Sequence, residues 1–298
     1  MSVLKKPYLP ICNIFNIIQK GEDMNCDPAN PKGSGIVNVW QESVPVRFGS
    51  IDTSDKLTLD AIFQFFQEAA ICHAENLGVG REAMAQTGQA WILSRMTVLV
   101  DRRPEYFETV SVRSWPRGFE KLFAIRDYCI KDKDDRAAVS ARSAWLIVDM
   151  EKRRPLRPQA VMEKLPLNEE LNAVTPEIAA ITGLAERDNL QKVSERKALY
   201  TDLDYNGHVN NARYINWIED ALDPQILTKA EKMRIDINYL NEVRPGETVE
   251  LLFAAIQPDE NHDCLKNCGK KCQPFAFEGR KTESGQTAFR AELRLWEL

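Results

Sequence analysis

Apolar and polar residues alternate in ten short runs of this chain, and two longer runs are apolar on more than one side. Alternation with a period of two is typical of strands that bury one face. The ten strand-like runs are residues 39–48, 91–100, 108–116, 121–130, 139–150, 193–204, 232–240, 247–256, 274–283 and 287–298. The two longer runs, residues 57–78 and 210–222, have the apolar spacing of helices. Each predicted helix follows one strand and precedes four, which indicates two copies of the same unit.

The two copies align over their helices without a gap. A shift of 152 positions (204 minus 52) places Asp52 over Asp204. In this alignment acids match acids, aromatic residues match aromatic residues and small residues match small residues: Asp52/Asp204, Glu68/Asp220, Phe65/Trp217 and Ala69/Ala221. Further on, "RRPEYFETVSV" resembles "EVRPGETVELL", with one extra residue expected in the first copy. The shared order indicates an internal duplication.

Both predicted helices are too apolar to leave one side in solvent, and the strands after each helix can wrap it in a curved antiparallel sheet. A sheet curled round a central helix is the hot-dog architecture, so we expect an α+β protein of two tandem hot-dog domains. Pairing of the two sheets would bury an edge of each. We expect an irregular leader over residues 1–36, an N-terminal domain over 37–165, a linker over 166–191 and a C-terminal domain over 192–298. Residues 167–186 have the pattern of a connecting helical segment.

Candidate chemistry gathers in the loop "DYNGH" that enters the second predicted helix. Asn206 and His208 are separated by one residue, so an extended loop points both side chains the same way. The helix start offers backbone N–H groups and the positive end of its dipole to a developing oxyanion. Such residues also suit ordinary turns and caps. The first copy, however, has Ser54 and Lys56 at the equivalent positions, which favours a chemical role in the second copy, with Asp204 as a further candidate.

Glu242 is the other candidate catalytic residue. It ends a strand-like run beside a Pro-Gly turn, in the copy that also carries His208. An acid at such a position is most often a solvated turn residue. In a hot-dog domain, however, this strand ends close to the start of the helix, where a carboxylate can activate water for attack on a carbonyl group.

Composition narrows the class of protein. Of the 298 residues, 44% are hydrophobic and 28% are charged, as in soluble globular proteins. The net charge of -5 disfavours a nucleic-acid-binding protein. The odd number of cysteines, with no secretory signal before them, indicates a reducing compartment, and we expect a cytoplasmic protein. The apolar segment 9–18 is too short to span a bilayer, so no stable membrane insertion is expected.

A cysteine-rich segment does not fit the duplicated pattern. Between two predicted strands lie four side chains that could bind zinc: His262, Cys264, Cys268 and Cys272. Three residues separate successive cysteines, unlike the two-residue spacing of zinc knuckles, so we expect a surface loop without a metal. His73, inside the first predicted helix, is expected to be a packed side chain.

Several segments together resemble the acyl-acyl carrier protein thioesterases of bacteria and plants. The second copy carries "DLDYNGHVNNARYINWIED" and "INYLNEVRPGE", and the first carries "VRFGSIDTSDKLTLDAIFQFFQEAAICHAENLG". The surroundings of five further residues are similar to that family: Trp91, Arg95, Pro104, Trp115 and Trp145. The resemblance extends in order over residues 37–248.

The resemblance implies hydrolysis of a fatty acyl thioester carried on the phosphopantetheine arm of acyl carrier protein, without a cofactor. Asp204 would orient the loop, and Asn206 and His208 would position the substrate carbonyl and the water. Glu242 would be the general base, and the acyl chain would lie in the N-terminal domain. The basic residues Lys152, Arg153, Arg154 and Arg157 are then either a solvated linker or a contact for the acidic carrier protein.

One position departs from the plant members, which have a cysteine after the glutamate where this chain has Val243. We therefore expect activated water rather than a covalent thiol. Two alternatives stay open: an acyl-CoA thioesterase of the same fold, and a non-catalytic acyl-thioester binding protein. A dehydratase of this fold is disfavoured because Glu219 is not a clear counterpart of the acid such enzymes carry on the central helix. A homodimer also stays open.

Overall fold

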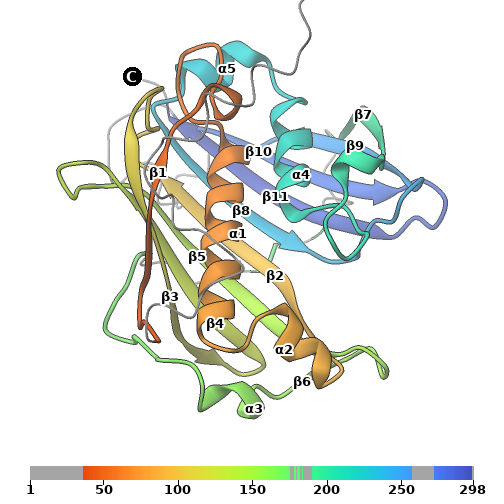
Figure 1. Ribbon diagram of the computed structural model, residues 1–298. Coiled ribbons are helices and arrows are strands. Elements are labelled where there is room, and N and C mark those ends of the chain that lie inside the picture. Colours follow the sequence, from red (N-terminus) through yellow and green to blue (C-terminus); the bar gives the residue numbers. More distant parts are fainter. Residues whose placement is uncertain are drawn as a thin grey trace, which may run out of the picture. The chain divides into compact units, whose positions relative to one another are not determined.

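One antiparallel sheet carries both copies of the duplicated unit (Figure 1). The computed structural model describes residues 36–174, 190–256 and 272–296, and in addition positions 178, 180, 181 and 183. The strands are β1 (Trp40–Pro45), β2 (Gln89–Val100), β3 (Thr109–Glu120), β4 (Phe123–Lys131), β5 (Ala137–Asp149), β6 (Arg154–Leu156), β7 (Gln191–Lys197), β8 (Lys232–Tyr239), β9 (Thr248–Ala255), β10 (Cys272–Lys281) and β11 (Thr287–Trp296). The helices are α1 (Leu59–Asn76), α2 (Arg81–Gln86), α3 (Gln159–Met162), α4 (Asn211–Glu219) and α5 (Pro224–Lys229). Each of the ten predicted strands is present, and β6 is an addition to them.

The strand order is mirrored about the middle of the sheet. From the middle outwards, one half has the order β2, β5, β4, β3, β1, with β6 added beside β5, and the other half has the order β8, β11, β10, β9, β7. The two halves join where β2 and β8 pair antiparallel, from Arg95 opposite Asn238 to Val100 opposite Met233. The expected fusion of two sheets into one is therefore confirmed, and it covers an edge of each half.

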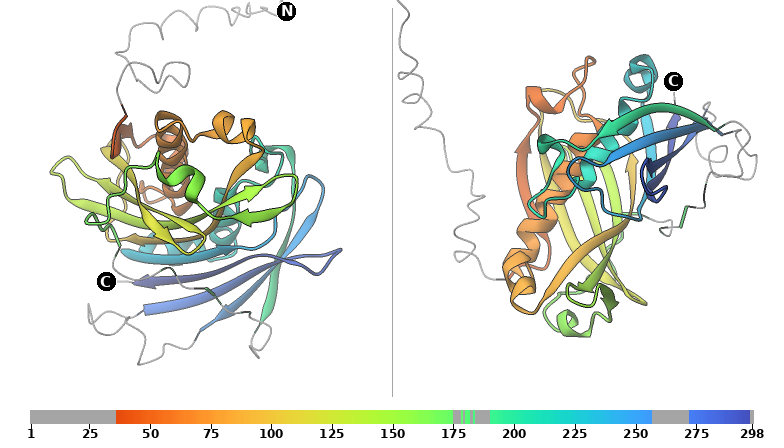
Figure 2. Two further views of the ribbon diagram at one scale, coloured as in Figure 1. Left: turned by 90° about the horizontal axis from the view of Figure 1, so that it is seen from below. Right: turned by 90° about the vertical axis from the view of Figure 1, so that its right-hand side faces the viewer.

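The sheet curls round α1 and α4, which lie on the same side of it (Figure 2). The hydroxyl of Thr58 caps α1 by accepting a hydrogen bond from the N–H of Ala61 (3.2 Å). The side-chain oxygen of Asn210 caps α4 by accepting from the N–H of Ala212 (2.9 Å). The apolar faces of both helices share one core with the sheet and include Leu59, Ile62, Phe63, Phe66, Tyr214, Ile215, Trp217 and Ile218. The apolar spacing thus explains why each helix is enclosed.

The loops before α1 and α4 make the same hydrogen bonds 152 residues apart. In each loop an aspartate Oδ1 accepts from the backbone N–H groups two and four positions further on: Asp52 from Ser54 (2.8 Å) and Lys56 (3.4 Å), and Asp204 from Asn206 (2.8 Å) and His208 (3.3 Å). The position between those two residues has a positive φ in both loops, 58° at Asp55 and 75° at Gly207. These shared contacts confirm the alignment over the helices.

The loops after β2 and β8 also correspond, but without the extra residue expected in the first copy. Leu57 donates its N–H to the carbonyl of Pro104 (2.8 Å), and Val209 donates to the carbonyl of Val243 (2.9 Å). Pro104 is therefore equivalent to Val243, and the residue before it, Arg103, is equivalent to Glu242. The expectation was wrong because it matched the residue types of the two turns rather than their backbone positions.

The predicted connecting helix is not present over residues 167–174, which form turns and extended chain. Several polar groups of this segment form hydrogen bonds with the N-terminal half of the protein. The side-chain amide of Asn168 donates to the carbonyls of Asn38, Pro116 and Pro166 (3.1, 3.2 and 2.9 Å). The N–H of Ala173 donates to Oδ2 of Asp127 (2.9 Å). These bonds compete with the i→i−4 bonds that a helix needs.

His73 is a packed side chain of α1, as expected. Its Nε2 lies 2.9 Å from the carbonyl of Val37, and its Nδ1 lies 3.1 Å from Nη1 of Arg126. Because a guanidinium can only donate, Nδ1 accepts and Nε2 carries the proton. Burial, with a smaller contribution from Arg126, lowers the pKa of His73 to about 4. Within the described ranges, none of the helices is long and apolar enough to cross a membrane.

Candidate active site

A backbone contact brings the predicted loop and Glu242 together. The hydrogen bond from Val209 to the carbonyl of Val243 fixes the end of the loop beside the turn after β8. Nε2 of His208 consequently lies 3.1 Å from Oε2 of Glu242. The imidazole side chain is 30% exposed and the carboxylate side chain 48% exposed. The pair is thus accessible to a substrate, while the bond between Val209 and Val243 fixes the backbone beside it.

Asp204 holds the loop in shape. Besides the two bonds to its Oδ1, its own N–H donates to the carbonyl of His208 (2.8 Å). Its Oδ2 lies 3.5 Å from the side-chain amide of Asn206. Gly207 adopts the left-handed φ of 75° that a residue without Cβ reaches at little cost. The structure therefore brings together Asp204, Asn206, His208 and Glu242, with Asp204 facing its own loop.

The side chain of Val243 lies in the core, with none of its surface exposed. Neighbouring residues of extended chain point to opposite sides, and here Glu242 faces outward while Val243 faces inward. A cysteine at position 243 would therefore lie on the opposite side of the backbone from the His208–Glu242 pair. Valine at this position leaves that pair intact.

A narrow cavity begins at the first turn of α4. Its lining comes from α4, from α1 and from the sheet of the N-terminal half: Asn211, Ala212, Phe63, Gln67, Leu93, Met96, Tyr128 and Trp145. The side-chain oxygen of Asn210 accepts a hydrogen bond from the N–H of Ala212. The N–H of Asn211, by contrast, has no protein acceptor within the part of the chain that the structure describes. A carbonyl oxygen can accept from this N–H, where the helix dipole favours negative charge.

Glu242 also lines a polar depression of the surface. It is lined by Asn241, Glu242, Arg244, Glu247, Lys281 and Gln286. Nη2 of Arg244 lies 3.3 Å from Oε1 of Glu242, so each carboxylate oxygen of Glu242 has a nitrogen partner, from Arg244 or from His208. Nζ of Lys281 pairs with Oε2 of Glu247 (3.0 Å). The carboxylate of Glu242 is thereby held between the depression and the loop.

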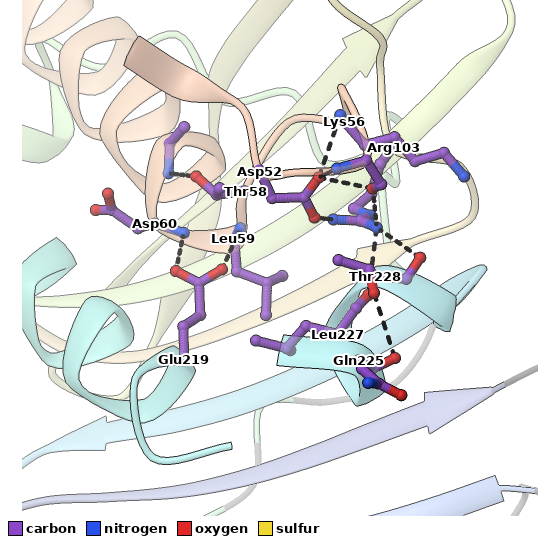
Figure 3. Close-up of polar contacts among 12 residues, drawn as sticks. Asp52, Lys56, Thr58, Leu59, Asp60, Arg103, Glu219, Gln225, Leu227 and Thr228 are labelled. Atoms are coloured by element: carbon purple, nitrogen blue, oxygen red, sulfur yellow. Dashed lines mark hydrogen bonds and ion pairs between the residues drawn. The ribbon is translucent and has the colours of Figure 1, made fainter. Parts of the chain in front are cut away.

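In the first copy the residue equivalent to Glu242, Arg103, pairs with Asp52, the equivalent of Asp204, and not with the equivalent of His208 (Figure 3). Arg103 forms an ion pair with Asp52, and it also donates to the carbonyl of Leu227 (3.2 Å). Its side chain is 3% exposed. Burial would raise the pKa of Asp52, but hydrogen bonds from Ser54 and Arg103 outweigh it and hold that pKa below its ordinary value. The first copy thus has a buried ion pair where the second has the accessible His208–Glu242 pair.

The cavity and its polar residue Gln67 were not predicted from the sequence. The signal was present, because the shift of 152 places Gln67 over Glu219, two polar residues inside apolar helices. Of the candidate zinc ligands, His262, Cys264 and Cys268 lie outside the described residues. Cys272 is buried at the start of β10, opposite Trp296. In the described part of the chain, no three side chains of His, Cys, Asp or Glu are grouped as a metal site requires.

Two family descriptions match this chain. "Acyl-ACP thioesterase N-terminal domain" matches residues 37–164, and "Acyl-ACP thioesterase C-terminal domain" matches residues 185–291. The chain belongs to the acyl-ACP thioesterase family. The C-terminal match contains all four predicted site residues, and the N-terminal match contains most of the cavity lining.

Solved structures of this family share the fold. An acyl-ACP thioesterase from Bacteroides thetaiotaomicron superposes with a TM-score of 0.70 at 24% identity, over 87% of this chain and 98% of that one. The 12:0-ACP thioesterase from Umbellularia californica gives 0.71 at 18% identity, over 88% of this chain and 98% of that one. The prediction of two tandem hot-dog domains is confirmed.

Curated plant relatives are also similar in sequence. The palmitoyl-acyl carrier protein thioesterase of Cuphea hookeriana is 27% identical over 255 residues, 79% of this chain and 59% of its own length. The oleoyl-acyl carrier protein thioesterase of Coriandrum sativum is 26% identical over 248 residues, 77% of this chain and 66% of its own length. The matches to three Cuphea relatives span 57 to 60% of those proteins.

Proposed function

We propose that this protein hydrolyses the thioester between a fatty acyl chain and acyl carrier protein, releasing free fatty acid and the carrier thiol. The observation that carries the proposal is the His208–Glu242 pair at 3.1 Å, beside the first turn of α4, in a chain of this family. The choice of carrier is supported by the names of the Cuphea and coriander relatives, which are described as thioesterases of acyl carrier protein.

In the proposed reaction Glu242 is the general base. It takes a proton from a water molecule, whose oxygen attacks the thioester carbonyl carbon. The oxyanion that forms accepts a hydrogen bond from the N–H of Asn211. The carbon–sulfur bond then breaks, and the leaving thiolate takes up the proton held by Glu242. His208 holds the carboxylate and the water in line, and Asn206 contacts the substrate at the loop.

The cavity at the first turn of α4 has a volume of only about 10 Å³, room for one water molecule, so it supports the direction of the acyl chain rather than a preformed pocket for it. Its apolar lining comes mainly from the N-terminal half, as in the expectation that the chain lies in that domain. A chain whose carbonyl group sits at Asn211 would pass Phe63 and Met96 toward Tyr128 and Trp145. A fatty acyl chain would fit only after these side chains move apart, and each methylene group it then buried would contribute about 0.8 kcal/mol of binding.

Hydrolysis of matched substrates tests the proposal. The purified protein is incubated with one acyl chain attached either to acyl carrier protein or to coenzyme A, and free acid and free thiol are measured. Equal amounts of acid and thiol, with a several-fold larger kcat/KM for the carrier protein, are expected. A larger kcat/KM for the coenzyme A thioester would contradict the proposal that acyl carrier protein is the carrier. Tight binding without hydrolysis would identify a non-catalytic binding protein.

A further inference from the structure

The end of α4 caps the beginning of α1. Oε1 of Glu219 accepts from the N–H of Leu59 (2.9 Å), and Oε2 accepts from the N–H of Asp60 (3.2 Å), as Figure 3 shows. A carboxylate is the group that a helix N-terminus binds best, because unpaired N–H groups and the dipole both favour negative charge. In the first copy, therefore, a carboxyl oxygen of the protein itself occupies the start of the helix.

In the second copy a neutral side chain stands at the position equivalent to Glu219. The shift of 152 that relates the two loops places Gln67 on Glu219 and Leu59 on Asn211. Gln67 is partly buried and lines the cavity together with Asn211 and Ala212. Gln67, in the middle of α1, thus lies at the cavity beside the first turn of α4, without the hydrogen bonds that Glu219 makes at the first turn of α1. Glutamine and glutamate have nearly the same shape, so the two side chains differ mainly in charge and in the amide N–H groups.

The difference in charge between Glu219 and Gln67 coincides with a difference between the two neighbouring loops. Where the helix start is closed by Glu219, the neighbouring loop holds the Asp52–Arg103 ion pair. Where it faces Gln67, the loop holds His208 beside Glu242. The oxygens of Glu219 also indicate where a negatively charged oxygen sits at a helix start in this fold, namely on the first two N–H groups.

We propose that Gln67 donates a hydrogen bond from its side-chain amide to the thioester carbonyl oxygen at Asn211, and that it must be neutral. A carboxylate at position 67 would accept from the N–H of Asn211 itself, as Glu219 does at Leu59, and would repel the developing oxyanion. Gln67 is then a second oxyanion donor, supplied by the N-terminal half to a reaction centred in the C-terminal half. This inference rests on the proposed function, which does not itself assign a role to Gln67.

The variant Gln67→Glu tests the inference with almost no change of shape. Loss of one oxyanion donor costs about 10²–10³ in kcat, so we expect that loss at alkaline pH, where the new carboxyl group is ionised, with KM within a few-fold of wild type. Because a protonated carboxyl group can donate again, the ratio of variant to wild-type kcat should rise as the pH is lowered. Gln67→Ala should lose a similar factor without this pH dependence, and it keeps the test open if Gln67→Glu folds poorly.

A matched control lies one turn earlier on the same helix. The exposed Gln64, which hydrogen-bonds to Asp60, is changed to glutamate and should keep nearly wild-type kcat. Wild-type turnover by Gln67→Glu and by Gln67→Ala would overturn the inference. Failure of the proposed function is distinguishable, because the wild type itself would then release no free acid from acyl-acyl carrier protein, whatever the residue at position 67.

Discussion

The same backbone frame holds two different pairs of side chains. In the first copy Arg103 and Asp52 form an ion pair that is nearly enclosed, whereas in the second copy Glu242 pairs with His208 and is about half exposed. The frame is the same because the flanking backbone bonds are the same. The difference between the two pairs is therefore chemical, and substitutions at equivalent positions can separate catalysis from folding.

Replacement of His208 by alanine should lower kcat/KM by about two orders of magnitude or more, because the variant loses the group that holds Glu242 and the water in line. The equivalent residue of the first copy is Lys56, and Lys56→Ala should retain most of the activity. Hydrolysis rates of both purified variants, with melting temperatures to confirm folding, check this expectation. Equal losses in the two variants would indicate a structural role for both loops.

Replacement of Arg103 by alanine should affect stability rather than chemistry. It leaves Asp52 partly buried without its cation, and removal of one partner of a buried pair typically costs about 3–5 kcal/mol. The free energy of unfolding from urea titration should fall by an amount near that range, while kcat of the folded variant stays close to wild type. An inactive variant of unchanged stability would contradict the assignment of this pair to folding.

Residue types and their spacing were sufficient to predict the four candidate site residues, because the duplication supplied an internal comparison. Their roles stay predictions. Gln67 could not be predicted as part of the site, since it lies far from the loop in sequence and reaches α4 only through antiparallel packing of the two helices. Arg103 was missed as the counterpart of Glu242, because backbone hydrogen bonds rather than residue types define that equivalence.

At the scale of elements, the N-terminus of α1 is capped by a side chain from α4. Each of the two helices begins at a polar cap, the first turn of α1 receives the carboxyl group of Glu219 at the end of α4, and Gln67 in the middle of α1 lines the cavity at the first turn of α4. Burial raises the pKa of Glu219 to about 7, although the N–H groups of Leu59 and Asp60 lower it. We therefore expect the stability of the junction between the two helices to depend on pH.

The stability of the protein should reflect this carboxyl group. Below pH 4.5, the ordinary pKa, Glu219 is protonated in both the folded and the unfolded chain. Between pH 4.5 and about 7 the folded chain holds the proton more tightly, so the free energy of unfolding falls as the pH rises. Between these two pH values the free energy of unfolding of the wild type should fall by about 3 kcal/mol relative to that of Glu219→Gln. Parallel pH dependences of the two proteins in urea titrations would contradict the raised pKa.

Alternation of apolar residues was enough to predict the strands, because each strand of this sheet buries one face against α1, α4 or the rest of the core. Elements without such a face were not predictable in this way. The short helix α5 begins at Pro224 and buries none of its residues fully. Residues 167–174 have a helical pattern, but the bonds of Asn168 and Ala173 to the N-terminal half prevail over it.

At the scale of the whole sheet, the pairing of β2 with β8 makes one site from two copies. The loop and Glu242 belong to the C-terminal half, while most of the cavity lining belongs to the N-terminal half. The hydroxyl of Thr97 on β2 donates to Oδ1 of Asp236 on β8 (2.7 Å), which adds a side-chain contact to the backbone ladder. Neither half has a complete site without the other.

Separation of the halves should therefore abolish both folding and activity. A fragment of residues 37–190 would expose the inner edge of β2 and lose the Glu219 cap of α1, and a fragment of residues 191–298 would expose β8. Unpaired edges of this kind favour aggregation. Each fragment expressed alone should lack a cooperative melting transition by circular dichroism, whereas co-expression should restore hydrolysis. Cooperative melting of one fragment by itself would show that the joined sheet is not required for folding.

The most direct test of the account is the kcat of Glu242→Gln, which keeps the shape of the side chain and removes the base. With acyl-acyl carrier protein as substrate, kcat should fall by about two orders of magnitude or more while KM and the melting temperature stay close to wild type. Glu283→Gln, at an exposed acid in the turn between β10 and β11, should match the wild type. A Glu242→Gln variant that is folded and turns over at the wild-type rate would contradict the central claim that this carboxylate activates the attacking water.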